Sequence, residues 1–76
     1  MATTDTNGTV SCISEIGETA GLVWTALNES GPLTLAKLVK QVDKPRDVVM
    51  QALGWLAREE KVDIHMERRS RVASLC

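Results

Sequence analysis

The stretch Val48–Glu67, VVMQALGWLAREEKVDIHME, contains a change of hydrophobic period that decides the fold. Its first part repeats apolar residues at the spacing of one helical face, whereas apolar and polar residues alternate after Lys61, as they do on a strand. The sequence therefore predicts a helix from Pro45 to about Glu59 and a strand from Val62. The helix is expected to bury Val49, Ala52, Leu53 and Leu56 and to expose Asp47, Gln51, Gly54 and Arg58.

The residues from Val62 to the end of the chain predict a β-hairpin. On its first strand the inward positions would be Val62, Ile64 and Met66, and the outward positions Asp63, His65 and Glu67. Residues 67–70 make a polar tip, and Arg71–Leu75 forms the returning strand.

Two further helices are expected upstream. Apolar residues at helical spacing predict the first helix from Ser14, whose side chain would cap it, to about Ser30. Its buried stripe would be Ile16, Ala20, Val23 and Leu27, with Trp24 at the edge. Gly31 and Pro32 end this helix, and a short extended segment follows. Thr34 would then cap a second helix from Leu35 to about Val42, which turns Leu35, Leu38, Val39 and Val42 inward.

This order of elements predicts an α+β fold, the winged helix-turn-helix, with three helices, a short strand and a C-terminal β-hairpin wing. Two short helices joined by a tight turn make the helix-turn-helix, and the hairpin is the wing that covers the open side of its core. Residues 1–12 show neither helical nor strand periodicity, so we expect a disordered tail there and a single domain over residues 13–76.

The segments AGLVWTALNESGPLTLAKL and VVMQALGWLAREEKV resemble a small family of uncharacterised prokaryotic winged helix-turn-helix proteins. The resemblance spans most of the chain, and ALGWLARE is its most specific part. It implies the fold and, by analogy with transcription regulators, DNA binding. Glu60 stands where the family pattern favours glycine. A left-handed Glu60 would cost on the order of 1 kcal/mol, which suggests a different construction of this helix end.

The composition limits the possible functions. Nine basic and ten acidic residues give a net charge of −1, so any affinity for nucleic acid must come from local clusters. No apolar run approaches the roughly 20 residues of a membrane span, and we expect a cytoplasmic protein without a membrane partner. The two cysteines, Cys12 and Cys76, have no metal-ligand spacing.

DNA binding is the leading functional hypothesis, with the third helix in the major groove and an arginine-rich wing on the backbone. Gln51 and Arg58 would reach base edges, although Asp47 and the pair Glu59 and Glu60 oppose phosphate. Further cations cluster at the second helix, at the start of the third and around the wing tip, namely Lys37, Lys40, Lys44, Arg46, Arg68, Arg69 and Arg71. A charged turn tip that serves only solubility is the competing interpretation.

A protein-interaction adaptor is the alternative function. Trp55 falls at the edge of the buried stripe, so two interpretations stay open. It packs over the second helix or the base of the hairpin as part of the core, or it forms a surface patch with Val48 and Met50 for a protein partner.

Catalysis is not expected. His65 has no nucleophile near it in sequence, and the chain contains no phosphate-binding loop, so we predict neither an enzyme nor a cofactor or metal site. The sequence indicates no dedicated dimer helix, which favours a monomer or a weak homodimer.

Overall fold

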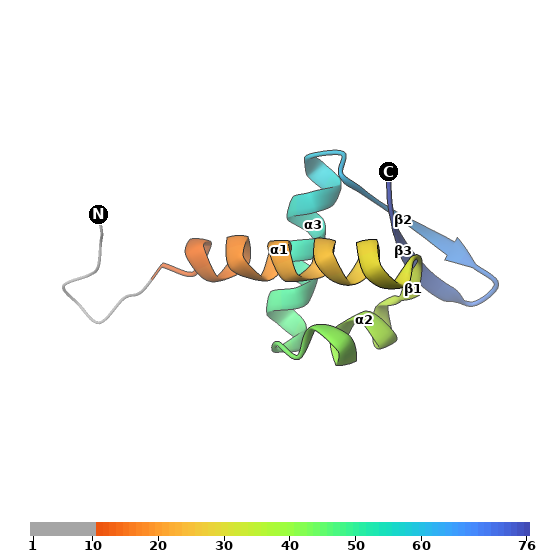
Figure 1. Ribbon diagram of the computed structural model, residues 1–76, viewed down its shortest axis with the longest axis horizontal. Coiled ribbons are helices and arrows are strands. Elements are labelled where there is room, and N and C mark those ends of the chain that lie inside the picture. Colours follow the sequence, from red (N-terminus) through yellow and green to blue (C-terminus); the bar gives the residue numbers. More distant parts are fainter. Residues whose placement is uncertain (1–10) are drawn as a thin grey trace.

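The computed structural model describes residues 11–76, so most of the tail predicted for residues 1–12 lies outside the described residues. Three helices and three strands follow one another in the predicted order (Figure 1). Their bounds are α1 Ile13–Ser30, β1 Leu33–Thr34, α2 Leu35–Val42, α3 Arg46–Arg58, β2 Val62–Glu67 and β3 Ser70–Leu75. The winged helix-turn-helix prediction is confirmed.

The three strands form one antiparallel sheet in the order β1, β3, β2. Leu33 of β1 pairs with Ala73, and β2 pairs with β3 from Val62 opposite Leu75 to Glu67 opposite Ser70. The central strand β3 therefore joins the hairpin to the segment between α1 and α2. Figure 1 shows that the end of the hairpin extends away from the helices.

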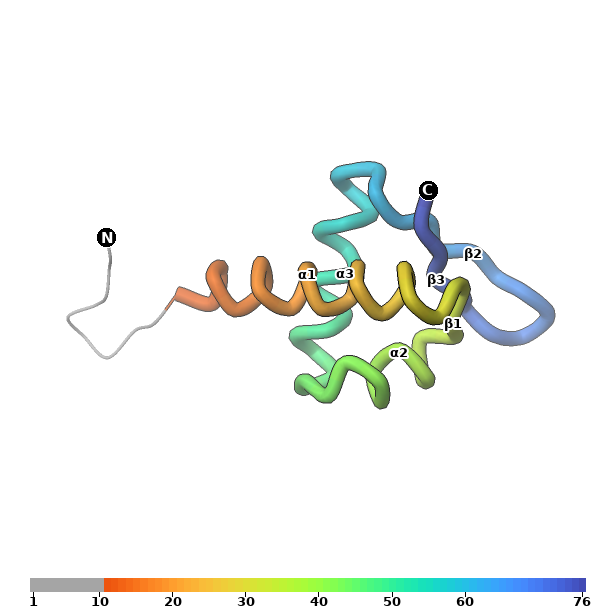
Figure 2. The backbone as a smooth tube through the Cα atoms, in the orientation of Figure 1, coloured from red at the N-terminus to blue at the C-terminus, as the bar shows by residue number. Residues whose placement is uncertain are grey.

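The core lies where α1, α2 and α3 meet the base of the sheet. It contains the predicted stripe of α3 and most of the predicted stripe of α1, while Ile16, Leu35 and Val39 pack against it half-buried. Thr19 and Ala26 of α1 and Val48 of α3 are also buried, which widens both stripes. Figure 2 shows α1 crossing α3, with its N-terminal half extending beyond the other elements.

Two predicted helix starts need correction. Ser14 does not cap α1, which begins at Ile13, and the Ser11 Oγ accepts the Ile13 amide at 3.3 Å. Pro45 is the residue before α3 rather than its first residue. Thr34 caps α2 as predicted, because its Oγ1 accepts the Lys37 amide at 3.3 Å.

The predicted alternation of burial along β2 is wrong beyond its first residue. Val62 is buried, but Ile64 is 37% exposed and Met66 is 58% exposed. Val62 and Ala73 belong to the core, so this is the side of the sheet on which the helices pack. The helices cover only the base of the hairpin, and the same side of the strand therefore becomes exposed towards the tip (Figure 1).

The end of α3 is built as the motif that usually contains glycine. Glu60 has a φ of 63°, in the left-handed region. Its amide donates to the Ala57 carbonyl at 3.0 Å, and the Lys61 amide donates to the Leu56 carbonyl at 2.9 Å. These two bonds and the left-handed residue define a Schellman motif. The expectation that Glu60 would change the construction of this helix end is therefore wrong.

Glu60→Gly should raise the free energy of unfolding by about 1 kcal/mol, because glycine adopts the left-handed conformation without the Cβ clash. Chemical denaturation would measure the change. Glu59→Gly is the matched control, since it removes the same charge at a residue with a φ of −80°. Equal gains in both variants would attribute the effect to charge and contradict the conformational explanation.

Thr19→Val should also stabilise the protein, by on the order of 1 kcal/mol. The Thr19 side chain is fully buried, and its Oγ1 has no hydrogen-bond partner among the described residues. Valine has nearly the same shape and removes an unsatisfied hydroxyl. Thermal unfolding of this variant and of Thr25→Val, an exposed position on the same helix, would test it. A lower melting temperature for Thr19→Val would mean that the hydroxyl is satisfied in solution.

Candidate nucleic-acid interface

The free face of α3 lies opposite its buried stripe. Asp47, Gln51, Gly54 and Arg58 are all exposed there, as predicted. The Asp47 Oδ1 accepts the Val48 amide at 2.9 Å. This carboxylate therefore accepts a hydrogen bond from one of the free amides at the start of the helix, where carboxylates are stabilising. Gln51 and Arg58 carry the long polar side chains of this face.

The cations of α2 and of the turn before α3 lie at the surface. Lys37, Lys40 and Arg46 are exposed, and Lys44 is half-buried. A side-chain hydrogen bond of 2.8 Å from Gln41 Nε2 to Ser30 Oγ connects α2 to the end of α1.

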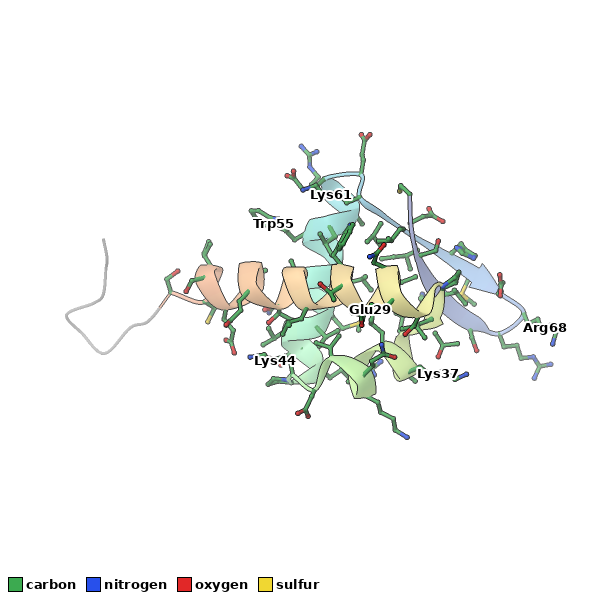
Figure 3. All side chains as sticks on the ribbon, in the orientation of Figure 1. Glu29, Lys37, Lys44, Trp55, Lys61 and Arg68 are labelled. Carbon is green, nitrogen blue, oxygen red and sulfur yellow. The ribbon has the colours of Figure 1, made fainter. Side chains whose placement is uncertain are left out.

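The wing tip carries the densest group of cations. Arg68 and Arg69 form the two-residue turn between β2 and β3, and Arg71 follows on β3; all three are exposed. Arg68 has a φ of 59°, in the left-handed region that favours glycine. Figure 3 shows Arg68 at the far end of the hairpin.

The two faces of the wing differ in charge. Asp63 and Glu67 lie on one face of β2, on either side of His65. The other face carries Ile64 and Met66, and Arg71 is paired with Met66 there. The carboxylates of β2 therefore lie on the face away from the core, and the face continuous with the core carries a cation.

His65 is held between two carboxylates, an arrangement that was not predicted from the sequence. Its Nδ1 lies 3.1 Å from Asp63 Oδ2, and its Nε2 lies 3.4 Å from Glu67 Oε2. The side chain is half-buried rather than fully solvated. The signal was present in the sequence, because residues i, i+2 and i+4 of a strand share one face.

The lysines and arginines of residues 11–76 form no ion pairs with acidic residues of the same range. Within residues 11–76, the close contacts between a basic and an acidic side chain are the two made by the His65 ring. No lysine or arginine of these residues lies within ion-pair distance of a described carboxylate. The positive charges of these side chains are therefore available to a ligand. The same residues contain no cluster of His, Cys, Asp and Glu that suits a metal ion, and none of their helices is long and apolar enough to cross a membrane.

Trp55 lies at the surface, 51% exposed. It faces α1 across a groove whose lining also includes Gly17, Gly21, Trp24 and Lys61. The interpretation of Trp55 as a core residue over α2 or the hairpin base is therefore wrong. The predicted patch also needs correction, because Val48 is buried and Met50 is half-buried.

Comparisons with known proteins agree on the fold. The family model described as "Winged helix-turn-helix domain (DUF2582)" matches residues 12–75. An uncharacterised protein of Methanocaldococcus jannaschii is 36% identical over 64 residues, which cover 80% of this chain and 90% of that protein. The solution structure of a Bacteroides thetaiotaomicron protein superposes with a TM-score of 0.77 at 32% identity, covering 86% of this chain and 79% of that one.

A second solved structure has the same fold at lower identity. It is the Zalpha domain of Carassius auratus PKZ, determined in complex with Z-DNA. The TM-score is 0.71 at 18% identity, and the match covers 82% of this chain and 98% of that one.

Proposed function

The chain belongs to the DUF2582 family of winged helix-turn-helix domains, and from this we propose that it binds DNA in a regulatory setting. In this fold the third helix commonly enters the major groove while neighbouring cations hold phosphates. Here α3 would enter the groove and the wing would follow the backbone. The Zalpha domain, whose structure contains Z-DNA, supports DNA as a partner of this fold; the analogy is one of architecture.

The observation that carries the proposal is the construction of the wing tip. An L-residue in the left-handed region costs on the order of 1 kcal/mol, and glycine would avoid this cost. Arg68 occupies this position, exposed and without a described carboxylate partner. Asp43 and Glu60 share this conformation at the ends of α2 and α3, whereas Arg68 holds it at the projecting tip of the wing, and strained residues concentrate at functional sites. A function for the guanidinium group, such as contact with a phosphate, explains why arginine stands there.

The remaining residues have separate roles in this proposal. Gln51 and Arg58, on the free face of α3, would contact base edges, because amide and guanidinium groups match the donor and acceptor pattern of the major groove. Phosphates would be bound by the cations of α2, of the start of α3 and of the wing, which are Lys37, Lys40, Lys44, Arg46, Arg68, Arg69 and Arg71. Arg71 lies on the wing face away from Asp63 and Glu67.

A protein-interaction adaptor is the second candidate. The exposed Trp55 and Trp24 on either side of one groove favour it, because tryptophan is enriched where binding energy concentrates. The two functions differ in their response to salt. Phosphate contacts weaken steeply as salt rises, whereas an apolar contact changes little.

An NMR titration with a mixed-sequence DNA duplex tests the proposed interface. At low salt the amides of Gln51, Arg58, Arg68 and Arg69 should shift. With about six phosphates neutralised, the affinity should fall by roughly 1000-fold between 50 mM and 200 mM salt. The indole resonance of Trp24, which lies on α1, serves as the internal control and should stay in place. An absence of shifts at low salt would reject DNA binding.

Arg68→Gly should change stability and DNA affinity in opposite directions. Loss of the strained conformation should raise the free energy of unfolding by about 1 kcal/mol. Loss of one phosphate contact should weaken DNA binding and reduce the salt slope by about one. Denaturation and fluorescence anisotropy would measure the two effects.

Glu60→Gly is the matched control for Arg68→Gly, because it relieves a left-handed residue without removing a cation. It should increase stability without loss of DNA affinity. If Arg68→Gly is more stable and binds DNA as tightly as the unchanged protein, the guanidinium group has no role in binding.

A further inference from the structure

The N-terminal half of α1 is only partly used by the fold. Figures 1 and 2 show this half extending beyond α3 and the sheet. Ile13, in its first turn, is 65% exposed. A helix of 18 residues that needed only to cover the core would end where the core ends. The extension therefore provides a helical surface without a partner in the described chain.

A groove lies between this part of α1 and the C-terminal half of α3. Trp24 on α1 is 41% exposed, and Trp55 on α3 is 51% exposed. Figure 3 shows Trp55 projecting from α3 on the side of the extended half of α1, with Lys61 near it. Two large exposed indole rings on one small domain are typical of an interaction site rather than of a solvated face.

The floor of the groove is open helix backbone. Gly17 and Gly21 lie one turn apart on the face of α1 that also carries Ile13 and Trp24. A Cβ atom added at either glycine would meet nothing within 4 Å. No close contact within the described chain therefore requires these glycines, although glycine lowers helix stability relative to alanine. Close approach by another helix would use this open backbone.

We propose that the groove binds the N-terminal half of α1 from a second copy of the chain, with the same contact made in return. The two helices would lie antiparallel across the Gly17 and Gly21 backbones. Ile13 of each copy would pack against Trp24 and Trp55 of the other. A two-fold interface uses one patch on both copies, and this patch carries both the apolar groove and the apolar helix end that fits it.

Charge favours a second copy as the occupant. Lys61 is the charged residue among those that line the groove. The charged residues of α1 are all acidic, namely Glu15, Glu18 and Glu29. By helical spacing, Glu15 and Glu29 lie on the side of α1 away from Gly17. Glu18, the residue after Gly17, lies about 100° round the helix, at the flank of the contact face. The helix from a second copy would therefore present an apolar face to the indole rings and bring the Glu18 carboxylate, not a cation, to the rim beside Lys61.

The available area indicates a weak dimer. The contact uses the N-terminal half of α1, about 14 Å of helix, together with the adjoining groove, which is a smaller patch than a standard interface. Specific interfaces usually cover about 800 Å² on each partner. We therefore expect a dissociation constant in the micromolar range or above. Trp55 adjoins Gln51 and Arg58 on α3, because residues three and four positions apart lie side by side on a helix.

Sedimentation equilibrium from about 10 µM to 1 mM protein, without DNA, tests this interface independently of the proposed function. The unchanged protein should shift from monomer to dimer. Gly17→Arg should remain monomeric, at least 100-fold weaker, because a long side chain would occupy the contact. Gly54→Arg is the matched control: this glycine is equally open and exposed, but on the free face of α3. It should dimerise like the unchanged protein.

Two further measurements identify the occupant. In a mixed sample with one copy isotope-labelled, Ile13 methyl protons should show intermolecular contacts to the indole rings of Trp24 and Trp55. Trp55→Ala should weaken the dimer as well, and circular dichroism should show that it and Gly17→Arg are folded. A protein that is monomeric at 1 mM, or a dimer that persists in Gly17→Arg without these contacts, would overturn the proposal.

Discussion

The pairing of β1 with β3 is the constraint on which the rest of the structure depends. A two-stranded hairpin is only marginally stable in water, and a third strand or a packed face is needed to support it. The two residues of β1 supply that strand, with Leu33 opposite the fully buried Ala73. Since β1 lies between α1 and α2, this short pairing attaches the wing to the helical core.

The attachment of β1 to the middle of β3, at Val72 and Ala73, leaves the tip of the hairpin without a third strand. Because the helices support only the first part of the hairpin, its end projects with Ile64 and Met66 exposed and with Arg68 and Arg69 at the turn. The exposed apolar side chains of β2 and the cationic tip therefore have the same origin, because the end of the hairpin projects beyond the helices. Helix α3 likewise has one side that is covered and one that is not. The uncovered side carries Gln51 and Arg58, and Trp55 lies at the edge between the two sides.

The two proposals use adjoining surfaces of this small domain. The proposed DNA binding would use the free face of α3 and the wing, where charge dominates. The proposed self-association would use α1 and Trp55, where large apolar side chains are exposed. A dimer would also address a general limitation of a domain this size, because a single small module buries little DNA and reads few base pairs. Pairing would place two DNA surfaces in one assembly.

The spacing of apolar residues and the positions of turn and cap residues determined the helices and strands. From these features followed the buried stripe of α3, the Thr34 cap and the order of helices and hairpin. The cation cluster at the wing tip was equally visible. Only the tertiary structure decided the rest. The exposure of Ile64, Met66 and Trp55 depended on how far the neighbouring elements reach, and the left-handed Glu60 and Arg68 depended on turns closed by the surrounding fold. Periodicity marks which side of an element is apolar, but contact with another element decides whether that side is covered.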